Sequence, residues 1–119
     1  MEAIMIDMYD FGVIVIDGKE YNRDLIILPT KVIEGWWRRE GHNLALEDLK
    51  ELVDLDSPPE VLVVGTGYSG MMNVPEDVED HLRRIGIEVI VEPTRNACRT
   101  FNTLLIKGRR VASALHLTC

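Results

Sequence analysis

A glycine-rich segment follows the apolar run at 61–64 and reads Gly65, Thr66, Gly67, Tyr68, Ser69 and Gly70. Its spacing matches G-x-G-x-x-G, with which a strand–turn–helix unit binds the pyrophosphate of a dinucleotide. In that pattern the last glycine already lies in the helix, whose N-terminus reaches the phosphates. Here residues 71–74 intervene before Pro75, and the chain is too short for two complete mononucleotide-binding halves. Three interpretations stay open: a dinucleotide site, a smaller nest of backbone N–H groups for an anion, and a tight loop in which glycine only supplies positive φ.

The start of a later helix offers side chains that suit an anionic ligand. Arg95 and Arg99 lie one helical turn apart, so their guanidinium groups can converge. Arginine pairs well with carboxylate or phosphate, and Thr94 is placed to cap the helix. In an α/β sheet this helix start and the glycine-rich segment share the edge where ligands bind. The alternative is a solvated helix face whose arginines balance acidic groups elsewhere.

No set of residues combines into a catalytic site. Ser69 lies in a segment that resembles the nucleophile elbow G-x-S-x-G, but Met71 replaces the last glycine. Cys98 lies near a helix start between two arginines, which favours a reactive thiolate, yet it shares a stripe with apolar residues, which favours the core. The three histidines lack the spacing of a zinc site. We therefore predict no catalytic residue, no metal and no cofactor, and we lean away from an enzyme.

Apolar spacing and turn residues predict the elements that position these groups. Asp17-Gly18 between two apolar runs predicts a β-hairpin, because both central residues of a type I′ turn need positive φ. Strands are expected at 11–16, 21–28, 31–37, 61–64, 87–91 and 111–117. Helices are expected at 45–55, at 75–85 and from 94 to 107, each ended by glycine or proline.

This alternation predicts an α/β fold in which at least the strands at 61–64 and 87–91 are parallel. Neighbours on a strand point to opposite faces, so one interpretation places one of Trp36 and Trp37 in the core and the other at the surface. An exposed tryptophan would be a favoured interface anchor, but we favour the alternative that both pack inside, one of them under the hairpin. His116 ends the last apolar strand and fits a core histidine with satisfied polar atoms.

The charge balance restricts the classes of partner. The 119 residues include 13 basic and 20 acidic side chains, a net charge of −7. This argues against a general nucleic-acid binder, which needs a basic surface. The first residues are acidic where a signal peptide is basic, and no apolar run approaches the ~20 residues of a membrane helix. We expect a cytoplasmic protein without membrane insertion. The last 27 residues differ, with no acid and five bases: Arg95, Arg99, Lys107, Arg109 and Arg110.

Two motifs together resemble a known family. They are V-V-G-T-G-Y at 63–68 and T-x-x-A-C-x-T-F-N at 94–102. They resemble the Mth-type conserved domain family, whose eukaryotic relatives include adipogenesis-associated domain proteins and a mitochondrial complex I assembly factor. The chain departs at Phe101, where tyrosine is common, and at Asn96, where a small residue is common. The missing tyrosine hydroxyl leaves less chemistry at this position.

The resemblance covers essentially the whole chain and implies a fold. That fold is a three-layer α/β arrangement with a mixed central sheet of about five strands, helices on its faces and an N-terminal β-hairpin. The antiparallel strand is expected to be the last one, near 110–117. The resemblance implies no established reaction or cofactor.

Residues and resemblance together favour one Mth-type α/β domain over 1–119 that acts as a binding or assembly-type module. Its partner would be another protein or a second copy of the chain. The alternative is a small-molecule protein or enzyme that binds a phosphate or carboxylate ligand. Such a ligand would contact Gly65, Thr66, Gly67, Tyr68, Ser69, Gly70, Thr94, Arg95 and Arg99.

Overall fold

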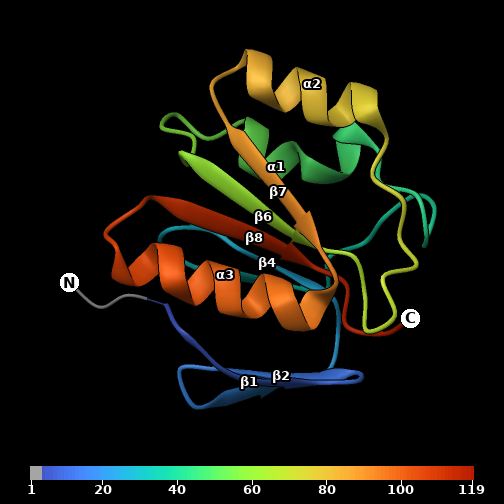
Figure 1. Cartoon of the computed structure of the whole chain (residues 1–119), viewed down its shortest axis with the longest axis vertical. Coiled ribbons are helices and arrows are strands. Elements are labelled where there is room, and N and C mark those ends of the chain that lie inside the picture. The colour runs from blue at the N-terminus through green and yellow to red at the C-terminus, as the bar shows by residue number, and fades with distance from the viewer. Residues whose placement is uncertain (1–3) are drawn as a thin grey trace.

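The computed structural model describes residues 4–119, and a five-stranded sheet lies at its centre (Figure 1). The strand order is β5-β4-β8-β6-β7. The bounds are β4 Leu25–Ile27, β5 Val32–Glu34, β6 Val61–Gly65, β7 Glu88–Glu92 and β8 Val111–Leu115. β6 is parallel to both β7 and β8, whereas β4 is antiparallel to β8 and to β5. The predicted mixed sheet of about five strands is confirmed.

The direction of the last strand corrects one expectation. β8 is parallel to β6, and the strand that runs against it is β4, so the prediction of an antiparallel last strand is wrong. The cause is α3 (Thr94–Ile106), which carries the chain from the end of β7 back to the start of β8. α2 (Glu76–Arg84) makes the same kind of crossover between β6 and β7. The carboxyl ends of three strands therefore lie at one edge of the sheet.

A second, three-stranded antiparallel sheet precedes this unit. It consists of β1 Ile6–Asp10, β2 Val13–Ile16 and β3 Lys19–Tyr21. Asp17 and Gly18 turn the chain between β2 and β3 with φ of 49° and 80°, which confirms the predicted hairpin. β1 was not expected, because a register shift between Ile6 and Met8 breaks the alternation that marks a strand. The strand predicted at 21–28 is divided, since the chain leaves this sheet at Tyr21 and enters β4 at Leu25.

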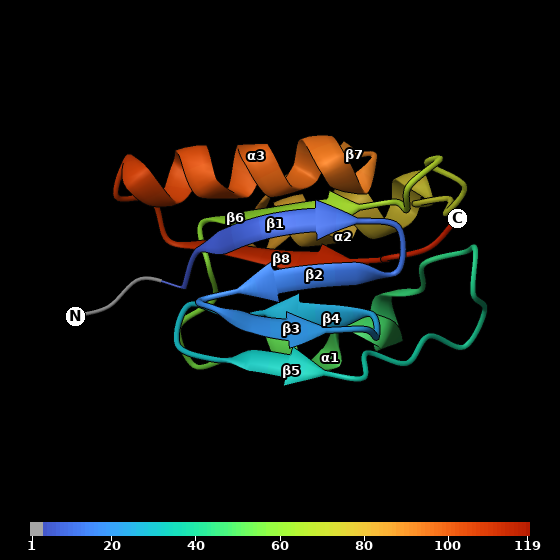
Figure 2. The ribbon, with the colours of Figure 1, turned by 90° about the horizontal axis from the view of Figure 1, so that it is seen from below.

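The elements pack in three layers, with the central sheet in the middle (Figure 1). One face carries α3 and the three-stranded sheet side by side; the other carries α2 and a short helical segment (Figures 1 and 2). Successive residues of β6 serve the two faces: Val61 and Val63 face α3, and Leu62 faces α2. All five β6 residues are buried, as expected for a strand covered on both sides.

The short helical segment differs from the helix predicted at 45–55. It consists of the 3₁₀ turn η1 (Leu46–Leu49) and one helical turn, α1 (Lys50–Val53). The Asp48 carboxylate accepts the Ala45 N–H at 2.9 Å and thereby closes the first turn. β5 is also shorter than predicted, because Gly35, with a φ of 77°, turns the chain out of the sheet. Within residues 4–119 no helix is long and apolar enough to cross a membrane.

Candidate functional site

The glycine-rich loop at 65–70 binds the segment that follows β8. The Tyr68 N–H donates to the Thr118 carbonyl at 3.0 Å, and the Met71 N–H donates to the Cys119 carbonyl at 3.1 Å. Gly67 permits this approach, because its φ is 112° and an added Cβ would collide with the Cys119 backbone. Close packing of two backbones is therefore one reason for glycine at this position.

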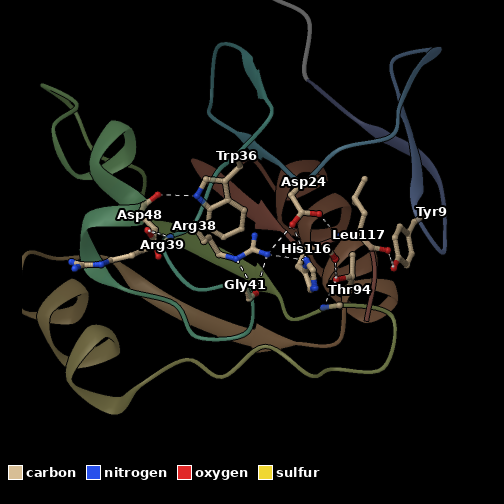
Figure 3. Close-up of polar contacts among 11 residues, drawn as sticks. Tyr9, Asp24, Trp36, Arg38, Arg39, Gly41, Asp48, Thr94, His116 and Leu117 are labelled. Carbon is tan, nitrogen blue, oxygen red and sulfur yellow. Dashed lines mark hydrogen bonds and ion pairs between the residues drawn. The ribbon is translucent and has the colours of Figure 1, made fainter.

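Thr94 joins three segments at this edge of the sheet (Figure 3). Its hydroxyl accepts the Gly67 N–H at 2.8 Å and donates to the His116 carbonyl at 2.6 Å. Its own N–H donates to the Gly67 carbonyl at 3.0 Å. The expectation that Thr94 caps α3 is wrong, because the helix begins at Thr94 and the hydroxyl is used elsewhere. An added Cβ on Gly65 would lie 2.8 Å from the Thr94 hydroxyl, so this glycine also allows close packing.

Most N–H groups of the loop have partners within the protein. The Thr66 N–H donates to the Glu92 carbonyl at 2.9 Å, and the Gly70 N–H donates to the Gly67 carbonyl at 3.2 Å. Ser69 is exposed at the outside of the loop. An anion at this loop would therefore find few free backbone donors, and the side chains near α3 become the more relevant part of the predicted site.

Arg95 and Arg99 are both exposed on α3, but they lie against β1 rather than in a common cavity with the loop. They line a hollow of about 200 Å³ together with Cys98 and Asn102 of α3 and with Tyr9 and other residues of β1. Arg95 also reaches the loop: its guanidinium carbon lies 5.3 Å from the centre of the Tyr68 ring and a terminal nitrogen lies 3.6 Å from an Asp10 carboxylate oxygen. The structure thus brings Arg95 to Tyr68 and places Arg99 on the β1 side.

Cys98 and Tyr9 line the same hollow without supplying a reactive group. Burial raises the pKa of the Cys98 thiol to about 12, although the nearby charge of Arg95 lowers it. Burial likewise raises the pKa of Tyr9 to about 12, and its hydroxyl donates to the Leu117 carbonyl at 2.7 Å. A neutral thiol is a poor nucleophile. Of the two interpretations of Cys98, the core position is the one that the structure supports.

A polar cluster of the partly buried Asp24 and the buried Arg38 and His116 lies beside Thr94 (Figure 3). Asp24 Oδ2 lies 2.9 Å from Arg38 Nη2 and 2.7 Å from His116 Nδ1. Asp24 Oδ1 accepts the Leu117 N–H at 2.8 Å. Strand pairing explains the encounter: Leu25 pairs with Leu115 in antiparallel strands, so the residues next to them come to face each other.

Opposing influences set the protonation of Asp24. Burial alone would raise its pKa, but hydrogen bonds from His116, from the Leu117 N–H and from Arg38 outweigh burial and hold the pKa below 3.8. The carboxylate is therefore ionised at neutral pH. Because it accepts at 2.7 Å from Nδ1 of His116, we assign a proton to that nitrogen.

Arg38 is buried as the counter-ion of Asp24. Its Nε and Nη2 donate to the Gly41 carbonyl at 3.2 and 3.0 Å, and its guanidinium carbon lies 4.6 Å from the centre of the Trp36 ring. Two buried atoms in the cluster have no hydrogen-bond partner, Arg38 Nη1 and His116 Nε2. The expectation that His116 is a core histidine is confirmed for its burial, but one of its nitrogens is not satisfied.

The two tryptophans beside Arg38 point in different directions. Trp36 is buried, and its Nε1 donates to the Asp48 carbonyl at 2.8 Å, whereas Trp37 is 77% exposed. The favoured expectation that both tryptophans pack inside is therefore wrong, and the alternative of one core and one surface tryptophan is the one that the structure supports. A hollow of about 510 Å³ lies between this segment and η1–α1, and its lining includes Ile33, Trp36, Trp37, Arg39, Glu47 and Glu51.

Sequence reasoning missed the cluster of Asp24, Arg38 and His116 as a unit. The only signal is the place of two of its members, because Asp24 directly precedes an apolar strand and His116 directly follows one. In the part of the chain that the structure describes, no group of three or more His, Cys, Asp or Glu side chains is placed to hold a metal ion. Chemically, the cluster offers a fixed ion pair and an oriented imidazole without a neighbouring nucleophile.

Three comparisons place the chain among known proteins. It is 35% identical over 115 residues to human "NADH dehydrogenase [ubiquinone] 1 alpha subcomplex assembly factor 3", covering 96% of this chain and 61% of that relative. A crystal structure of a conserved hypothetical protein from Pyrococcus horikoshii shares 30% identity and a TM-score of 0.78, covering 100% of both chains. A crystal structure of an outer membrane protein from Bartonella henselae shares 26% identity and a TM-score of 0.83, covering 98% and 97% of the two chains.

These matches confirm the resemblance found in the sequence and the fold that it implies. The chain spans only 61% of the length of the human assembly factor. The family described as "Protein of unknown function (DUF498/DUF598)" has a model that matches residues 6–116, which include the glycine-rich loop, Thr94 and His116, and the chain belongs to this family.

Proposed function

We propose that the chain is a protein-binding module that assists the assembly of a larger complex, with residues 1–119 acting as one domain. A relative with 35% identity is named an assembly factor, and the family has no established reaction. The observation that carries the proposal for this chain is Trp37, which is 77% exposed at the rim of the hollow of about 510 Å³. A cytoplasmic location and the lack of nucleic-acid binding stay predictions of the sequence.

The surroundings of Trp37 suit a binding surface. Tryptophan and arginine dominate the binding energy of protein interfaces, and both occur here as Trp37 and Arg39. Two hydrogen bonds to Asp48 hold the segment that carries them in place. Trp36 Nε1 donates to the Asp48 carbonyl, and the Asp48 carboxylate accepts the Arg39 N–H at 3.2 Å. A surface that is already ordered loses less conformational entropy on binding.

Trp37→Ala tests this proposal. Tagged wild-type chain and the tagged variant are expressed in the native host, and the proteins that copurify with each are quantified. Calorimetry then measures the affinity of these proteins for the purified wild type and the purified variant. We expect the variant to lose a partner that copurifies with wild type. The affinity of the variant for this partner should be at least about 30-fold weaker than that of wild type, since a hot-spot residue contributes about 2 kcal/mol. Ile106→Ala is the matched control, because Ile106 is 74% exposed on another surface. Unchanged partners and affinities in Trp37→Ala would contradict the proposal.

A second candidate is the binding of a small phosphate or carboxylate ligand between Arg95 and Arg99. The observation that favours it is the hollow of about 200 Å³ that both guanidinium-bearing side chains line together with Asn102. The ligand-binding residues predicted from the sequence, Gly65–Gly70 with Thr94, enter this candidate only through Tyr68, which Arg95 contacts.

Thermal shift with phosphate, short carboxylates, NAD(P) and FAD tests the second candidate. We expect phosphate or a carboxylate to raise the melting temperature of wild type, and the double variant Arg95→Ala/Arg99→Ala to lose this effect. Arg83→Ala/Arg84→Ala on the exposed end of α2 removes the same number of charges as a control. If no compound stabilises the fold at millimolar concentration, or both double variants respond as wild type does, the anion site is wrong.

A further inference from the structure

His116 presents a buried nitrogen that the fold leaves without a partner. Its Nδ1 is engaged with Asp24 at 2.7 Å, while Nε2 is buried and forms no hydrogen bond to the described residues. A buried polar atom without a partner has lost its hydration without gaining a hydrogen bond, so it calls for an explanation. With the Nδ1 proton assigned to the contact with Asp24, Nε2 carries the lone pair in that tautomer.

In metal sites, a histidine that binds the metal through one nitrogen usually donates the N–H of its other nitrogen to a carboxylate or carbonyl. Such a carboxylate fixes the ring orientation and makes the free nitrogen a better ligand. Asp24 has this relation to His116, and the Leu117 N–H fixes Asp24 in turn at 2.8 Å. Arg38 also lies 3.0 Å from Nδ1, but Asp24 neutralises its charge at 2.9 Å.

A second histidine faces the same ring. His42 lies in the loop between β5 and η1, and its ring centre is 5.8 Å from that of His116, with 68° between the ring planes. Two imidazoles that bind one Zn²⁺ through nitrogens at about 2.0–2.1 Å have ring centres separated by a similar distance. His42 is exposed, so its ring can turn to aim a nitrogen at an ion that His116 holds.

We propose that His42 and His116 together bind a divalent transition-metal ion such as Zn²⁺, with Asp24 as the positioning carboxylate. Imidazole is a preferred ligand of these ions. Within residues 4–119 no third side chain of His, Cys, Asp or Glu completes the group. The remaining coordination positions therefore belong to water or to a donor from a bound partner, which makes this an open site.

Calorimetric titration of the full chain with ZnCl₂ tests the proposal, and ¹⁵N NMR of the imidazoles shows which nitrogens respond. We expect one ion per chain and a response at Nε2 of His116. His42→Ala removes a surface ligand without disturbing the core and is expected to abolish saturable binding. His81→Ala, at a half-buried position of α2, is the matched control and is expected to bind within twofold of wild type.

Two further variants separate the proposed site from other sources of zinc binding. Asp24→Asn is expected to weaken binding by about 10- to 100-fold, as loss of a carboxylate that orients a metal-binding histidine does. Cys119→Ser removes the exposed thiol and is expected to leave binding unchanged. The proposal is overturned if wild type binds no Zn²⁺ up to millimolar concentration, if His42→Ala binds as wild type does, or if Cys119→Ser alone abolishes binding.

Discussion

At the scale of single residues, Asp24 does most to organise the candidate site. Its two carboxylate oxygens hold Arg38, His116 and the backbone of Leu117 at 2.7–2.9 Å. These three groups come from the segment after β5 and from the end of β8, so one side chain fixes two distant parts of the chain. The Arg38 side chain is only 5% exposed and depends on this carboxylate for its counter-charge.

Asp24→Asn is predicted to destabilise the fold in a pH-dependent way. The variant leaves Arg38 buried without a counter-ion, which we expect to lower the free energy of unfolding by about 3 kcal/mol at neutral pH. The pKa of Asp24 is held below 3.8 in the folded state. The contribution of the Asp24 carboxylate to the free energy of unfolding is therefore complete at a pH above the pKa that Asp24 has in the unfolded chain. It is lost as the pH falls through the pKa that Asp24 has in the folded chain. Urea denaturation of wild type and variant at several pH values measures the difference, which should narrow below about pH 4.

The double variant Asp24→Asn/Arg38→Met provides the control. It removes the buried positive charge as well, so we expect it to be more stable than Asp24→Asn alone. A free-energy difference between wild type and Asp24→Asn that is the same at pH 3 and pH 7 would show that the charge of Asp24 is not responsible.

At the scale of elements, the loop after β6 is the piece that brings the others together. It forms backbone hydrogen bonds with Thr118 and Cys119 and contacts the start of α3 through Thr94. Gly67 is the point of closest approach, since a side chain there meets the Cys119 backbone.

Gly67→Ala is predicted to lower the free energy of unfolding by more than about 2 kcal/mol, because strain at positive φ adds to a collision with backbone. Gly86→Ala is the matched control: its φ is 91°, but an added Cβ meets nothing within 4 Å. It should cost only about 1 kcal/mol, from the backbone conformation alone. Chemical denaturation measures the free energy of unfolding of both variants. An equal loss in both would show that close packing of Gly67 against the Cys119 backbone does not contribute to stability.

The same loop shows how far the sequence predicts the structure. The elements from β6 to β8 follow from local signals, such as the apolar run at 61–64 and the glycine at 108 after α3, because these signals act between near neighbours. Gly67 and Thr94 lie in recognisable motifs and were predicted as site residues. The contact between Asp24 and His116 spans 92 residues and depends on β4 pairing with β8, which no local spacing encodes. The Arg38 anchor could not be predicted for the same reason.

At the scale of the whole molecule, the central sheet separates two apolar cores. Phe101 of α3 packs in the core shared with the three-stranded sheet, and Leu82 of α2 packs in the core on the opposite face. Both side chains are almost fully buried, with exposures of 1% and 0%. Since β6 and β8 each contribute residues to both cores, the two faces of the sheet are expected to unfold together as one cooperative unit.

Phe101→Ala and Leu82→Ala test this cooperativity, and with it the prediction that residues 1–119 form one domain. Each truncation leaves a cavity and should cost about 3–4 kcal/mol. The two residues share no apolar cluster, so the costs should add within about 0.5 kcal/mol in the double variant. Denaturation followed by tryptophan fluorescence and by circular dichroism should give coincident single transitions for each single variant. Two separated transitions, or a Leu82→Ala variant that loses α2 while the three-stranded sheet and α3 unfold later at the wild-type midpoint, would mean that the sheet does not couple its two faces.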